Sequence, residues 1–429
     1  MNHRLSQHPL RAVLHNEIHA RPPEGMPVPL SISHVVMGCD PQQREASRAH
    51  LAALLRDHHL PLPDPDSNHL RTEIGPLLIR WELHTEFVTW TFLQEPPQDT
   101  VSGTREPQPA VAAAPHDWFN ALPGQCLSCL NLWVLPARDN ANNVLVRHML
   151  DEDTLVASSV ADGFGEVYTD FAIHPDGFSR MLLFAGSLMP RRLGRLVQRL
   201  LEIETYRMAA LLGLPAARET FAVLGAAERE LAELAQAIRS ANREEEPLLL
   251  NRLTKLAGQV ESQHAATHSR FSASSAYFEL VDKRIADISE SRLSGMQTIG
   301  EFMERRLTPA RSTCAWATRR QDALSQRVSR ISNLLRTRVE IEQQQSSQGL
   351  LAAMNARQDL QLKLQATVEG LSVAAITYYI VGLIGYFAKG VQASGWPWSA
   401  ESTMAAAIPV VALGVWWSLH GLHKRYLKL

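Results

Sequence analysis

The sequence predicts an α+β protein: a sheet-and-helix domain, then a long helical or coiled-coil stalk, and finally a two-helix transmembrane hairpin. Three observations support this fold class. Short runs rich in Val, Ile, Leu and Thr, bounded by turn-forming residues, crowd into the first half of the chain. After Pro215, apolar residues recur at helical spacing. Two uncharged apolar stretches lie close to the carboxy terminus.

The short apolar runs predict strands because β-branched and aromatic residues suit a pleated, half-buried surface. We expect strands at Pro29–Met37, Leu77–His84, Glu86–Leu93, Cys126–Leu135, Asn143–Met149 and Asp153–Val160. The clearest hairpin joins Glu166–Ile173 to Phe178–Phe184, with apolar and polar residues alternating along its first arm. Helical spacing at Pro41–His58 and Pro190–Leu212 completes a domain over residues 1–215. Its Pro-rich segment 95–115 is expected to be a disordered loop.

Residues 216–367 are predicted to form a stalk of long helices. Pro309 is expected to kink or end a helical run that contains Phe278 and Met303. Beyond it, apolar residues spaced by about one turn continue toward the carboxy terminus: Leu324, Val328, Ile331, Leu335 and Val339. Such a stripe needs neighbouring helices to cover it, so we expect coiled-coil-like packing within the chain or between copies.

Residues 368–429 are predicted to form the transmembrane hairpin. Leu371–Ala388 and Ser402–Leu419 approach the ~20 apolar residues that cross a bilayer core. The basic residues of the tail predict that both chain ends face the cytoplasm. Small residues at Gly382, Gly385 and Gly414 favour close packing of the two helices, and Pro409 favours a kink. The alternative is a buried hairpin of a soluble protein.

The composition of the chain indicates which partners it can bind and in which cellular compartment it lies. The net charge of −2 gives no electrostatic footprint for nucleic acid. Four Cys in 429 residues are not a disulfide framework, and the amino end lacks the apolar core of an export signal. We therefore expect a multi-pass membrane protein with its large polar part in the cytoplasm, and with the lipid bilayer and further copies of itself as partners. Any protein partner and any cofactor stay unknown.

One polar cluster near the amino end is a candidate ligand site or structural site: Arg11, His15, Asn16, Glu17, His19 and Arg21. His15 and His19 would share a helix face, as in zinc proteases. That motif, however, places Glu directly after the first His, whereas Asn16 stands there. The cluster is therefore either a set of mutually paired polar groups or a site for a ligand or ion.

Cys126 and Cys129 form a C-x-x-C motif without a second pair. They lie in an expected strand, where positions three residues apart face opposite ways. We therefore interpret both as small core residues, and we disfavour redox or zinc chemistry for the pair.

Four longer strings resemble a bacterial family of membrane-anchored proteins of unknown function. They occupy His8–Pro23 (HPLRAVLHNEIHARPP), Ile203–Pro215, Gln297–Cys314 and Thr367–Gly390. The resemblance spans almost the whole chain and implies no activity. The order of parts is also similar to that of CorA-type metal ion channels, but the Gly-Met-Asn signature of those channels is missing, and Gly385-Tyr386-Phe387 stands at the end of the first span.

Three functions fit these features. The favoured one is a non-enzymatic, homo-oligomeric membrane scaffold, because long apolar stripes need partners. The second is a CorA-like channel or transporter, in which backbone carbonyls could supply selectivity. The third is a membrane-tethered enzyme that uses the amino-terminal His, Glu and Arg residues.

Overall fold

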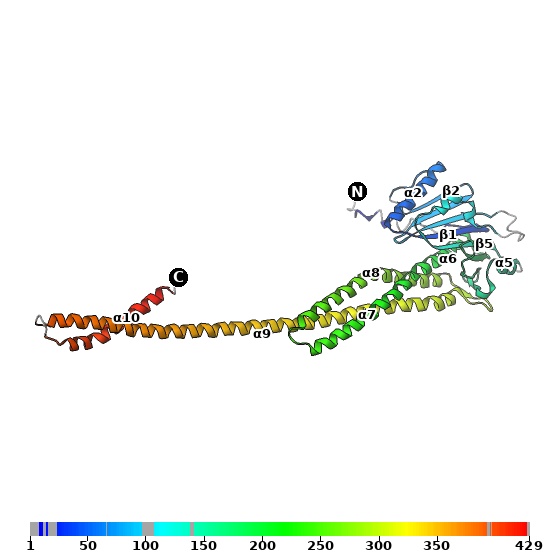
Figure 1. Ribbon diagram of the computed structural model, residues 1–429. Helices are drawn as coiled ribbons and strands as arrows, with labels where there is room; N and C mark the ends of the chain where they lie inside the picture. Colours follow the sequence, from blue (N-terminus) through cyan, green and yellow to red (C-terminus); the bar gives the residue numbers. More distant parts are fainter. Residues whose placement is uncertain are drawn as a thin grey trace, which may run out of the picture. The chain divides into compact units, whose positions relative to one another are not determined.

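The computed structural model describes residues 8–11, 14–15, 24–65, 67–96, 107–137, 141–392, 395 and 397–426. These residues have a mixed α+β fold, with a sheet first and long helices after it (Figure 1). The chain divides into two compact units. One contains Met1–Ala241 and Asn251–Ile331, and the other contains Asn242–Leu250 and Ser332–Leu429. The three-part division at residues 215 and 367 stays a prediction.

One nine-stranded sheet is seen in the described residues, with the order β2-β3-β4-β1-β5-β8-β7-β6-β9. The strands are β1 (Leu30–Gly38), β2 (His69–Ile74), β3 (Leu77–Leu83), β4 (Phe87–Gln94), β5 (Gln125–Pro136), β6 (Val156–Val160), β7 (Gly165–Thr169), β8 (Ser179–Ala185) and β9 (Ser291–Arg292). All pairings are antiparallel except the one between β5 and β8. The expected hairpin is confirmed as β7 and β8, with Thr169 opposite Met181.

The sheet contains two successive halves with the same order of elements. Each half has a strand, a helix and then three antiparallel strands: β1-α2-β2-β3-β4 and β5-α5-β6-β7-β8. In each half the last strand returns to lie beside the first, so β1 and β5 meet in the middle of the sheet. This arrangement places the most buried strands at the centre.

Helices cover both faces of the sheet (Figure 1). Helix α2 (Pro41–Asp57) packs on one face through Leu51, Leu54 and Leu55, and α5 (Ala141–Met149) contacts residues of the same face in the second half. Helix α6 (Pro190–Leu211) packs on the opposite face, where its apolar residues join Leu130, Leu132 and other inward side chains of the strands. The core therefore has two layers, one on each side of the sheet.

Helices α7 (Gly213–Ser240), α8 (Glu246–Asp287) and the first part of α9 (Ile299–Gln392) run side by side as a three-helix bundle (Figure 1). Arg320 of α9 donates two hydrogen bonds to Glu228 of α7, and Gln321 bonds Thr267 of α8. These helices thus fold back on one another. The first part of the predicted stripe is buried by the protein's own chain, as Leu324 and Val328 show.

The remainder of α9 and the last helix, α10 (Ala400–Tyr426), differ from the bundle in their exposure. Between residues 343 and 368 nearly every side chain of α9 is exposed. The exposed residues include large apolar ones: Leu350, Leu351, Met354, Leu360, Leu362, Leu364 and Val368. Among the described residues, nothing covers this second part of the stripe.

One predicted strand was wrong, and one strand was not predicted. The segment Asn143–Met149 is not a strand but helix α5, whose buried residues Val146, Met149 and Leu150 recur at helical spacing while Val144 points outward. A short run of this kind is ambiguous between the two periods. Strand β2 was missed because its sequence, HLRTEI, is mostly polar, as suits a strand at the edge of a sheet.

The helix break was also placed wrongly. Pro309 lies inside α9, and the interruption falls between Asp287 and Ile299, where Ser289 and Gly295 have positive φ. Helix α9 then begins with a capping box in which Thr298 and Glu301 bond each other's backbone amides. The sequence Thr-x-x-Glu is the signal that marks this start.

The expectation of disorder over 95–115 was wrong for residues 107–115. They include a 3₁₀ turn at Ala110–Ala113, and Ala110 is fully buried. The Val111 amide donates to Ser33, and the Trp133 indole donates to the Gln108 carbonyl. Specific bonds to the sheet thus order a segment that has little apolar surface of its own.

Three described helical segments are long and apolar enough to cross a membrane, by length and composition: Pro190–Ser240, Ile299–Val391 and Ala400–Leu419. The first segment contains α6, whose apolar residues already pack on the sheet. The most apolar window of the third segment contains no buried residue. The two candidates near the carboxy terminus therefore correspond to the predicted hairpin.

Candidate functional site

A polar cavity lies between the sheet and α6, and titratable side chains of several kinds gather around it. Its volume is about 60 Å³. Its lining residues come from β1, β3, β4 and the turn between β3 and β4 on one side, and from α6 on the other: His34, Arg80, Glu82, His84, Phe87, Thr89, Gln198, Leu201, Glu202, Thr205 and Tyr206. The space is enough for a few water molecules or one small polar group.

His34 is a buried residue of the cavity lining, and hydroxyl groups lie close to both of its ring nitrogens. Its Nδ1 atom lies 2.8 Å from the hydroxyl of Thr91, and its Nε2 atom lies 3.0 Å from the hydroxyl of Thr205. Burial, with a smaller contribution from the Arg80 charge, lowers the pKa of His34 to about 3. The imidazole is therefore neutral near pH 7 and serves as a hydrogen-bonding group.

Charged groups of both signs surround His34. On the sheet, Arg80 lies 3.8 Å from Glu82, and Thr89 donates a hydrogen bond of 3.4 Å to the same carboxylate. On α6, Glu202 accepts a hydrogen bond of 3.0 Å from Gln198 and pairs with Arg284 of α8. The cavity thus offers a guanidinium and two carboxylates to a small polar ligand.

The groups around this cavity can form hydrogen bonds with a small polar molecule. The cavity lining contains no cysteine or serine that a base could activate. In the part of the chain that the structure describes, no group of three or more His, Cys, Asp and Glu side chains could hold a metal ion. One signal in the sequence points to the cavity: a histidine inside the apolar run of Pro29–Met37, since such a residue must find polar partners when buried.

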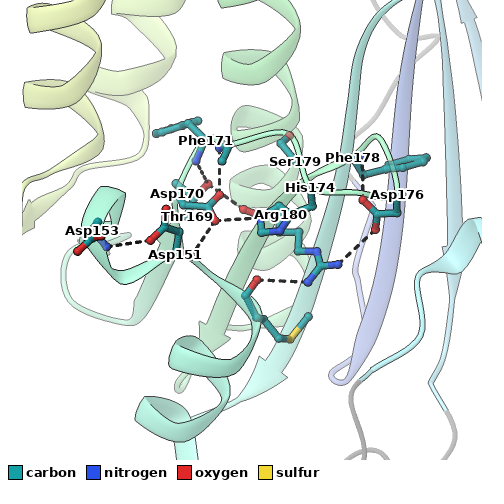
Figure 2. A network of polar contacts seen from close by, with 12 residues as sticks. Asp151, Asp153, Thr169, Asp170, Phe171, His174, Asp176, Phe178, Ser179 and Arg180 are labelled. Atoms are coloured by element: carbon teal, nitrogen blue, oxygen red, sulfur yellow. Dashed lines mark hydrogen bonds and ion pairs between the residues drawn. The ribbon is translucent and has the colours of Figure 1, made fainter.

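A second polar network supports the loop between β7 and β8 (Figure 2). The fully buried carboxylate of Asp170 accepts hydrogen bonds from the backbone amides of Asp151 and Ala172, at 3.0 Å each, and lies 2.9 Å from Nε2 of His174. Figure 2 shows Asp151 and His174 beside the Asp170 side chain. The bonds hold the loop in a shape that includes Phe171 at a positive φ of 52°. Asp170 therefore acts as a structural anchor.

The amino-terminal cluster is only partly described. Arg11 and His15 are exposed. Asn16, Glu17, His19 and Arg21 lie outside the described residues, so the assignment of a ligand site or structural cluster stays a prediction.

The small residues of the predicted hairpin differ in their surroundings. A Cβ atom added to Gly385 would lie 2.3 Å from the Met404 sulfur, so α9 and α10 approach closely at this point. Added Cβ atoms at Gly382 and Gly414 would meet nothing within 4 Å. Pro409 lies inside α10. Close packing is therefore seen at Gly385 alone among these three glycines.

Fold and site together define the class of the protein: an α+β domain with a central polar cavity, joined to a helical bundle and an apolar helical pair. The chain belongs to the family described as protein of unknown function (DUF3422), whose model matches residues 6–426. This confirms the resemblance to a family without a known activity. No curated protein and no solved structure matches the chain, so the similarity to CorA-type channels gains no support.

Proposed function

We propose that this protein is a membrane-anchored, homo-oligomeric scaffold of the bacterial inner membrane that holds its α+β domain on the cytoplasmic side. The observation that carries the proposal is the exposed apolar surface of the two carboxy-terminal helices. Tyr379, Leu383 and Phe387 on α9, and Val410 and Trp417 on α10, are each more than two-thirds exposed. Apolar surface of this extent and length requires lipid or protein around it.

Composition supports lipid as the surrounding medium. Neither Leu371–Ala388 nor Ser402–Leu419 contains an Asp, Glu, Lys or Arg residue. Trp398 lies in the link between the spans, where aromatic residues favour the membrane surface. The tail supplies Lys424, Arg425 and Lys428, which favours a cytoplasmic carboxy terminus.

Self-association follows from the second part of the stripe on α9. At 100° per residue, six of its exposed apolar positions fall within an arc of about 120°. They are Leu350, Met354, Leu360, Leu364, Val368 and Leu371. Copies anchored in one membrane present this face at the same height and in parallel. A second copy of the same helix is therefore the partner that we propose for it.

Membrane anchoring is tested by placing charge in the spans of the full-length chain. Leu383→Arg together with Leu413→Arg costs about 5–7 kcal/mol for insertion. We expect the double variant to be extracted from bacterial membranes by alkaline carbonate, while the wild type stays in the pellet. Leu350→Arg is the matched control, because it adds charge at an equally exposed leucine outside the spans. Carbonate extraction of the wild type would contradict the anchor.

Oligomerisation is tested by the mass of the detergent-solubilised protein, measured by light scattering. Leu364→Glu with Val368→Glu is expected to reduce the mass to that of one chain, since both residues belong to the exposed face. Asn355→Glu with Ala366→Glu, two exposed positions on the other side of the helix, is the control. A wild-type monomer would contradict the scaffold, and ion flux through liposomes containing the wild type would favour the channel instead.

A further inference from the structure

Cys126 and Cys129 lie side by side on the sheet, contrary to the expectation that they face opposite ways. Their sulfur atoms are 2.9 Å apart, and both cysteines are free thiols. Cys126 is exposed and Cys129 is half-buried. They are therefore not simple core residues.

A β-bulge brings the two thiols together. In the pairing of β5 with β1, Val36 lies opposite Ser128 and Met37 lies opposite Cys126, so Leu127 is an extra residue without a partner. The inserted residue reverses the alternation of side chains, which places Cys126 on the same face as Cys129. Sequence spacing alone cannot show this, because the bulge depends on the register with β1.

Both sides of the bulge are fixed by side-chain bonds. Ser128 points to the opposite face and donates a hydrogen bond of 2.8 Å to Glu204 of α6, and two bonds from Arg207 hold that carboxylate. Ser179 donates a bond of 3.1 Å to the backbone carbonyl of Cys129. The two sulfurs are thus held in contact by the surrounding structure.

The two thiols have different reactivities. The hydrogen bond from Cys129 lowers the pKa of Cys126 to about 7. The same contact, followed by burial, raises the pKa of Cys129. An exposed, readily ionised thiol beside a shielded one matches the attacking and resolving cysteines of dithiol redox sites.

We propose that Cys126 and Cys129 form a redox-active dithiol, a thiol–disulfide exchange site that reacts with small disulfides. The Cys126 thiolate attacks one sulfur of a low-molecular-weight disulfide, which forms a mixed disulfide and releases the first thiolate. The Cys129 sulfur then attacks Cys126, gives its proton to the second leaving thiolate and closes the Cys126–Cys129 disulfide. The two cysteines lose two electrons, and the small disulfide gains them as two thiols.

Two observations favour this chemistry over a structural role. The thiol of Cys126 is exposed, so core packing does not explain its contact with Cys129, in contrast to Cys39 and Cys314, which are buried. No third metal ligand joins the pair among the described residues, which disfavours zinc. The dithiol lies in the sheet domain, so its chemistry is independent of how the carboxy-terminal helices are anchored.

The test is a titration of the full-length, detergent-solubilised protein with mixtures of reduced and oxidised glutathione, followed by alkylation and peptide mass spectrometry. We expect the wild type to form an internal Cys126–Cys129 disulfide. Cys129→Ala should accumulate glutathione on Cys126, because no thiol remains to release it. Cys126→Ala should leave Cys129 unmodified over the same time. Cys39→Ala with Cys314→Ala is the control and should behave as the wild type does.

Three results would overturn the proposal. One is a wild-type pair that stays reduced in oxidised glutathione. Another is a Cys129→Ala variant that carries no more glutathione than the Cys126→Ala variant. The last is zinc bound to the purified wild type, found by native mass spectrometry and lost in either single variant. Because Cys126 is exposed, its replacement leaves the packing of the sheet intact, and thermal melting of each variant checks this.

Discussion

The Nε2 atom of His34 lies 3.0 Å from Oγ1 of Thr205, and this contact joins the central strand β1 to helix α6. The single hydroxyl proton of Thr205 is donated to the Leu201 carbonyl at 2.9 Å. His34 must therefore donate from Nε2, which leaves Nδ1 to accept a hydrogen bond from Thr91. The structure thus assigns one neutral tautomer to a buried imidazole.

This assignment predicts how stability depends on pH. The pKa of His34 is about 3 when folded, against about 6.5 when unfolded. Below pH 6.5 the unfolded chain binds a proton that the folded chain does not. Stability is therefore lost as the pH falls toward 3, by up to about 1.4 kcal/mol per unit. His34→Gln keeps a donor toward Thr205 but cannot titrate, so thermal melting between pH 7 and pH 5 should show a shallower decline than in the wild type. Equal slopes would contradict the assignment.

The contact between Cys126 and Cys129 predicts a pH-dependent reactivity. In Cys129→Ala the pKa of Cys126 should return toward about 8.5, which lowers its thiolate fraction at pH 7 about fifteenfold. A more basic thiolate is intrinsically more nucleophilic, by about fivefold, so the net fall in alkylation rate is about threefold. Time-resolved alkylation with iodoacetamide measures the rate from pH 5.5 to 9.5. Cys129→Ser retains a hydroxyl donor and should fall between the wild type and the Ala variant; an unchanged profile in the Ala variant would refute the contact.

Gly385 predicts where the two carboxy-terminal helices tolerate a side chain. Gly385→Val places a Cβ atom against Met404 and should lower the melting temperature of the solubilised protein, because helices that meet at a small residue must move apart. Gly382→Val is the matched control, since its Cβ atom would meet open space. Adding Met404→Ala to Gly385→Val should restore most of the loss. If Gly382→Val lowered the melting temperature equally, the change in helix propensity from Gly to Val would explain both results, and the contact with Met404 would not.

The pair of Arg320 and Glu228 predicts an energetic coupling between α9 and α7. Two hydrogen bonds of 2.9 and 2.6 Å join them, and they lower the pKa of Glu228. A double-mutant cycle with Arg320→Ala and Glu228→Gln should give a coupling of about 0.5–1 kcal/mol in chemical denaturation. The same cycle with Arg319, an exposed neighbour, should give none. The coupling should also vanish as the pH falls through the pKa of folded Glu228.

Several elements could be predicted because their signals are local. Strands β1, β3, β4 and β5 follow from short runs of β-branched and aromatic residues, and helices α2 and α6 follow from Pro at their starts and from helical spacing. The capping box of Thr298 and Glu301 is an equally local signal, and it marks the start of α9. The short segment that became α5 carried too few residues to separate the two periods.

The candidate sites could not be predicted in the same way. The cavity joins His34 to Thr205, which are 171 positions apart, and the redox pair depends on a bulge that only the register between β5 and β1 creates. The spacing of residues along the sequence predicts neither the contact between His34 and Thr205 nor the bulge in β5.

Composition and periodicity were enough to predict the α+β fold class and the two uncharged apolar helices at the carboxy end, because these signals act over neighbouring residues. The family was indicated by the resemblance of four specific strings, not by composition or periodicity. The folded chain was needed to learn which part of the long stripe on α9 is covered, as at Leu324, and which part is exposed, as at Leu364. It was needed again to find Cys126 on the same face as Cys129. Whether a side chain is buried, and which side chains it contacts, depends on residues that folding brings from distant parts of the chain. The neighbouring sequence does not identify those residues.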